Sequence, residues 1–100
     1  MVDPSFTGSL MYHSRERAEH RRIHANAQGR LQILLDYIDA ETEVEWRNRL
    51  HYLRHVTSSI ARFEQAMIEY HEAIIVFWIQ VFIGPGCDLP VRPHREQFGL

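Results

Sequence analysis

The sequence predicts an all-α protein, folded as a two-helix antiparallel hairpin with coiled-coil-like packing and irregular termini. Proline and glycine, the residues that most often interrupt helices, are almost confined to the ends of the 100-residue chain. Between Tyr12 and Ile83 there is no proline and one glycine, Gly29. The second half carries an apolar heptad repeat, and a short acidic segment separates it from the first half. The chain is therefore expected to form two helices and to double back between them.

We divide the chain into an irregular N-terminal arm, a helical hairpin domain and a C-terminal tail that contains proline and glycine. A chain of 100 residues is long enough for one domain only. The three segments are residues 1–13, 14–83 and 84–100. We expect the tail to be extended and to become ordered only against a partner.

The helix boundaries follow from capping residues. Ser14 is a suitable N-cap for the first helix, which we predict over about residues 14–39. Thr42 and Glu45 have the spacing of a capping box, so the longer second helix is predicted over about residues 43–83. The acidic segment between the helices, residues 36–45, holds five acidic residues and no basic one.

Both predicted helices carry an apolar stripe. In the first helix the stripe is Ala27, Leu31, Leu34 and Ile38, at spacings of three and four residues. In the second helix, heptad position a is held by Trp46, Leu53, Ile60, Met67, Ile74 and Val81, and position d by Val56, Phe63, Tyr70 and Phe77. Only Arg49 interrupts the d series. The expected hairpin core is Leu31, Leu34, Leu53, Ile60, Phe63 and Met67.

The second helix is expected to extend past the first. A turn near residue 41 makes facing residue numbers add up to about 84, so a first helix that starts at Ser14 covers the second to about residue 70. Beyond Glu72 the second helix is apolar on all sides, and such a surface needs a cover from elsewhere. We therefore predict a partner-binding end formed by Ile75, Phe77, Trp78, Ile79 and Phe82.

A group of histidines forms the second candidate site. His20 and His24 are four residues apart on one helix, a spacing that metal sites use, and the predicted register places Glu64 opposite His20. The candidate ligands are His13, His20, His24, Glu64 and His71. The sequence has neither an HExxH motif nor the Glu-x-x-His spacing of di-iron bundles. Half-buried packing histidines with a hydrogen bond to Glu64 are therefore the preferred interpretation, with a metal site or a pH-responsive contact as alternatives.

Composition argues against catalysis and against a nucleic-acid partner. All eleven residues of the lysine and arginine class are arginine, which excludes Schiff-base chemistry, a lysine base and a Walker-type loop. The single cysteine, Cys87, excludes an internal disulfide framework. The formal charge is −2, so the arginines of residues 13–30 are interpreted as a solvated face or as ion pairs across an oligomer. We expect neither an enzyme nor a cofactor.

The chain is not expected to carry a targeting or membrane-spanning segment. Its first residues have no basic region followed by an apolar run, which a signal peptide requires. The longest apolar run, residues 73–83, is shorter than the ~20 residues of a transmembrane helix. An intracellular location, soluble or bound in an assembly, is the expectation.

These observations predict a small non-catalytic structural or assembly subunit, or an adaptor. It would form a homo-oligomer or dock into a larger complex through residues 73–83, and two hairpins could pair head to tail, the arginine-rich end of one against the acidic turn of the other. Two alternatives stay open: a peripheral membrane protein that inserts residues 73–83 at an interface, and a histidine-based metal or pH-sensing protein.

Overall fold

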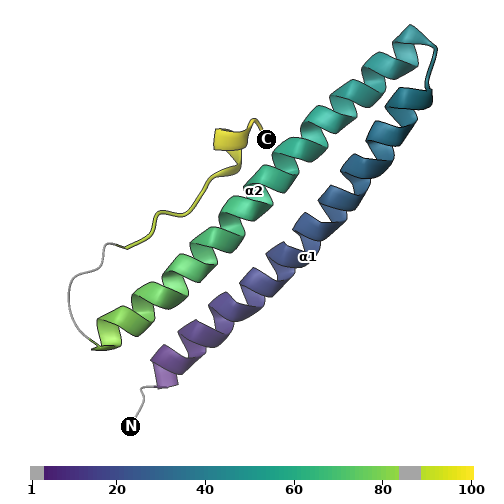
Figure 1. The fold of residues 1–100 in the computed structure, drawn as a ribbon. Coiled ribbons are helices and arrows are strands. Elements are labelled where there is room, and N and C mark those ends of the chain that lie inside the picture. The colour runs from purple at the N-terminus through teal and green to yellow at the C-terminus, as the bar shows by residue number, and fades with distance from the viewer. Residues whose placement is uncertain (1–3, 84–88) are drawn as a thin grey trace.

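The protein is a two-helix hairpin, as predicted. The computed structural model describes the backbone of residues 4–83 and 89–100, and the side chains of residues 7–81 and 89–100. Helix α1 (Pro4–Ala40) and helix α2 (Val44–Ile83) lie side by side and antiparallel, and a 3-10 turn, η1 (Arg95–Phe98), follows near the C-terminus (Figure 1). The link between the helices is three residues long, Glu41 to Glu43, and the Glu43 N–H donates to the Glu41 carboxylate at 2.8 Å.

Helix α1 begins well before its predicted start. It starts at Pro4 instead of Ser14, so the prediction of an irregular arm over residues 1–13 is wrong from Pro4 onward. Proline is tolerated in a first helical turn because the missing N–H has no intrahelical partner there. The extra turns also pack, since Ser9 and Leu10 are half-buried. Ser14, the expected cap, is an exposed residue inside the helix.

The predicted register of the hairpin is confirmed. The His20 imidazole bonds the Glu64 carboxylate, and the Nδ1 atoms of His13 and His71 are 2.8 Å apart. In both pairs the residue numbers add up to 84, and this register sets Pro4 level with about residue 80. Helix α1 therefore runs alongside α2 almost to its end, as Figure 1 shows. The predicted overshoot of α2 beyond residue 70 is wrong, because it depended on the late start of α1.

The core agrees with the prediction on α1 and departs from it at one end of α2. Ala27 and Ile38 are buried, and Leu31 and Leu34 are half-buried. On α2, Met67 and Phe63 are buried and Ile60 is half-buried, as expected. The further buried residues of α2 are Ser59, Ala61, Glu64, Ile68, His71 and Ile74.

Leu53 is the core residue that was wrongly predicted, with an exposed fraction of 49%. Glu64 and His71 of α2 contact α1, and both lie at heptad position e. The a/d stripe of α2 therefore does not point directly at α1 but lies beside the contact. Near Leu53 no third element covers that side in the part of the chain that the structure describes. A heptad residue there stays exposed.

The C-terminal tail packs against α2 of its own chain. Residues 89–100 return along the helix (Figure 1), and the Phe98 ring meets the Phe63 ring edge to face at 5.8 Å between centroids. The Arg95 guanidinium lies 5.5 Å from the centroid of the same ring. Gly99 ends η1 with φ 77°, a conformation that favours glycine. The expectation that the tail needs a partner chain to become ordered is wrong for these residues, because Phe63 at position d of α2 provides a docking surface within the same chain.

Candidate functional site

The predicted partner-binding end of α2 is only partly exposed. Ile75, Phe77 and Trp78 are half-buried, Ile79 is exposed, and the side chain of Phe82 lies outside the described residues. Val76 and Val81, two neighbouring residues that were not predicted, are exposed as well. The last turns of α2 therefore keep an apolar outer surface, although α1 covers their inner side.

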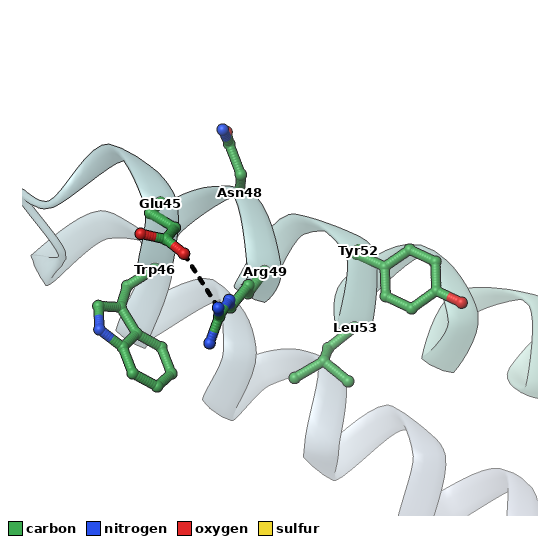
Figure 2. Close-up of a pocket in the computed structure, with 6 residues that line it drawn as sticks. All are labelled: Glu45, Trp46, Asn48, Arg49, Tyr52 and Leu53. Carbon is green, nitrogen blue, oxygen red and sulfur yellow. Dashed lines mark hydrogen bonds and ion pairs between the residues drawn. The ribbon is translucent and has the colours of Figure 1, made fainter.

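A second apolar surface lies near the hairpin turn and was missed in the sequence. Trp46 and Leu53 were assigned to the heptad stripe, but about half of each side chain is exposed. With Tyr52 they line an open groove of about 550 Å³, whose other lining residues are Glu45, Asn48 and Arg49. Figure 2 shows Trp46, Arg49 and Leu53 pointing to the same side of the first turns of α2. We call this surface the tip groove.

Arg49 organises the tip groove. Its guanidinium lies 5.0 Å from the centroid of the Trp46 ring and donates to the Glu45 carboxylate at 3.0 Å (Figure 2). The arginine thus covers part of the indole while its charge is paired along the helix. The interruption of the d series by Arg49 was the one sequence signal that this part of the stripe does not face a closed core.

The tip groove and the part of α2 that the tail covers belong to the same apolar heptad repeat. Phe63 holds position d and is covered by Phe98, whereas Trp46 and Leu53 hold position a nearer the turn and have no such cover in the described residues. Residues 89–100 lie along the middle of α2, away from the turn (Figure 1). One side of α2 is therefore covered along its middle and open at the tip groove.

The histidine cluster forms between α1 and α2. His13, Glu16 and His20 come from three successive turns of α1, and the confirmed register brings them to Glu64 and His71 of α2. The His20 and His71 rings stack at 5.5 Å between centroids, and the His13 and His71 rings lie 5.1 Å apart. Glu64 and His71 are buried. The pairing of the helices thus assembles the polar cluster that the sequence predicts.

Not every predicted member joins the cluster. His24 is half-buried one turn further along α1, and its Nε2 atom lies 3.4 Å from the side-chain nitrogen of Gln28. Glu16, which was not among the predicted ligands, takes its place, with a carboxylate oxygen 3.9 Å from His20 Nε2. Glu16 and His20 are four residues apart on α1, a spacing that was available in the sequence.

Burial keeps the inner histidines neutral. Desolvation lowers the pKa of His71 to about 4, and the neighbouring His13 and His20 act in the same direction. Burial also lowers the pKa of His13, against the opposing effect of Glu16. At neutral pH both imidazoles therefore carry one ring proton and one lone pair.

No family model matches this chain, and neither known proteins nor solved structures show significant similarity to it. Among the described residues, no helix combines the length and the apolar character needed to cross a bilayer.

Proposed function

We propose that this chain is a small non-catalytic assembly subunit that pairs with a second copy of itself through the exposed apolar surface of α2. The observation that carries the proposal is the tip groove, where the heptad residues Trp46 and Leu53 keep exposed fractions of 52% and 49%. Large apolar side chains gathered in one groove are typical of surfaces that bind another protein. A helical partner is favoured because the groove continues a heptad stripe.

Charge favours a second copy, arranged head to tail. Residues 36–45 next to the tip groove carry five acidic residues and no basic one, whereas residues 13–30, in the middle part of α1, carry five arginines and two glutamates. Two tips placed together would repel each other, while a tip placed beside residues 13–30 of another hairpin is attracted to their arginines.

Substitutions in either apolar surface test the pairing. We expect the purified full-length chain to be a dimer, and Leu53→Glu or Ile79→Glu to convert it to a monomer, because each places a charge in a desolvated contact. Both residues are exposed in the single chain, so the helical content is expected to stay unchanged. Light scattering coupled to size exclusion measures the mass, and circular dichroism measures the helicity.

Ile33→Glu is the matched control. Ile33 is an exposed isoleucine of α1 that does not line the tip groove, so this variant is expected to stay dimeric. The dimer should also weaken as the salt concentration is raised above about 0.15 M. At these concentrations the Debye length is shorter than ~8 Å, so the attraction between exposed charges is screened. A wild-type chain that is monomeric at high concentration contradicts the proposal, and flotation of that monomer with lipid vesicles would support the membrane alternative instead.

A further inference from the structure

We propose that the histidine cluster binds a divalent metal ion of the zinc class, with Glu16, His20 and His71 as ligands. One ligand atom from each of these residues lies within 4.8 Å of the others. Two imidazoles and one carboxylate are a donor set that zinc accepts in proteins. Two of the ligands come from one face of α1 and the third from α2, so an ion at this point would connect the two helices.

Glu64 orients His20 as a ligand. In the tautomer that carries its proton on Nδ1, the His20 imidazole donates to the Glu64 carboxylate, which is itself buried between the helices. This bond leaves the lone pair on Nε2, the nitrogen that faces Glu16. A carboxylate that holds the far nitrogen of an imidazole is the usual support of a metal-binding histidine.

His20 Nε2 and the Glu16 carboxylate face each other at this point. His20 Nε2 and the Glu16 carboxylate oxygen are 3.9 Å apart, too far for a direct hydrogen bond. When the imidazole proton is on Nδ1 both are acceptors, so their contact is stabilised by a cation or by a bridging hydrogen-bond donor in the gap. A proton on His20 or a bound metal ion meets that requirement.

His71 supplies the second, independent observation. Its exposed fraction is 3%, and its Nε2 atom is buried and has no hydrogen-bond partner among the described residues. Its other nitrogen, Nδ1, lies 2.8 Å from His13 Nδ1, so one of the two nitrogens donates to the other. When the proton is on His71 Nδ1, the buried Nε2 atom presents a lone pair that no protein group uses. Coordination of a metal ion gives this nitrogen a partner.

The spacing fits zinc after a small adjustment. Zinc lies about 2.0–2.2 Å from nitrogen and oxygen ligands, so tetrahedral ligand atoms are roughly 3.3–3.6 Å apart. The Glu16 side chain is partly exposed and free to rotate inward by the difference. Three protein ligands leave a fourth position for a water molecule.

Calorimetric titration of the metal-stripped, tag-free full-length chain with Zn²⁺ at neutral pH tests the site. We expect one ion per chain. Glu16→Gln and His20→Gln remove a ligand and should each lower the affinity at least about tenfold, and Glu64→Gln should lower it roughly ten- to a hundredfold through the lost orientation of His20. Glu16 is only half-buried on the surface of α1, so its variant is expected to fold normally.

Two control variants separate this site from adventitious binding. Glu19→Gln changes an exposed carboxylate of the same helix that pairs with Arg22, and His51→Ala with His55→Ala removes an exposed histidine pair of α2. Both should bind Zn²⁺ like the wild type. The visible spectrum of the Co²⁺-substituted chain should show tetrahedral ligation that Glu16→Gln abolishes. Absence of binding by the wild type, or binding that Glu16→Gln and His20→Gln leave unchanged, overturns the proposal.

Discussion

Met67→Ala is expected to lower the free energy of unfolding by about 2–5 kcal/mol, because truncation of a fully buried side chain loses its burial and leaves a cavity. Met67 is 1% exposed, the lowest value among the apolar core residues. Small domains have a total stability of about 5–15 kcal/mol, so the variant should be partly unfolded at moderate denaturant concentrations where the wild type is folded. Urea unfolding followed by circular dichroism measures the difference.

Met11→Ala is the matched control for this prediction. Met11 is the same residue type on the other helix, and half of its side chain is exposed. Its replacement should change the stability by no more than about 0.5 kcal/mol. Equal effects of the two substitutions would contradict the core described for α2.

Acid is expected to destabilise the metal-free protein by about 3 kcal/mol between neutral pH and pH ~4 through His71 alone, since each unit of pKa corresponds to ~1.4 kcal/mol. The pKa of His71 is about 4 in the folded chain and near 6.5 when exposed. Between these values the unfolded chain binds a proton that the folded chain excludes. The stabilisation is therefore complete above pH ~6.5 and is lost as the pH falls towards 4.

The groups around His71 modify this dependence without reversing it. From α1, His13 and His20 oppose its protonation and Glu16 favours it, and Arg92 of the tail also opposes it. Urea unfolding in the presence of a chelator at several pH values measures the effect. His71→Gln should flatten the curve by about 3 kcal/mol over this range, and an unchanged curve would contradict the buried, neutral state of His71.

Local patterns in the sequence were sufficient to predict the hairpin and its register. The short acidic link limits how the two helices can pair, and the pairs His20–Glu64 and His13–His71 follow from that one constraint. Four of the five residues of the histidine cluster, all except Glu16, could therefore be located from the sequence. Glu16 shares a helix face with His13 and His20 in the sequence, but it was not listed as a candidate ligand, because the register alone does not define the rotation of α1 about its axis.

Other features depend on which element covers which side of α2. The heptad pattern treats Leu53 and Met67 alike, yet one is half exposed and the other buried. The tail covers α2 near Phe63, and no such cover lies over Leu53 among the described residues. The start of α1 was misplaced for a similar reason: Ser14 is a suitable cap, but packing against α2 favours continuing the helix back to Pro4.

The buried pair of His20 and Glu64 also determines which of several alignments the two helices adopt. A heptad stripe offers similar apolar contacts when one helix slides past the other by seven residues. A slide of that size in one direction would set Glu64 opposite Ala27, and in the other it would set His20 opposite Thr57. The first alignment leaves a buried carboxylate without its partner, which costs about 3–5 kcal/mol. The buried pair thus disfavours the first alignment, in addition to the constraint that the three-residue link places on the register.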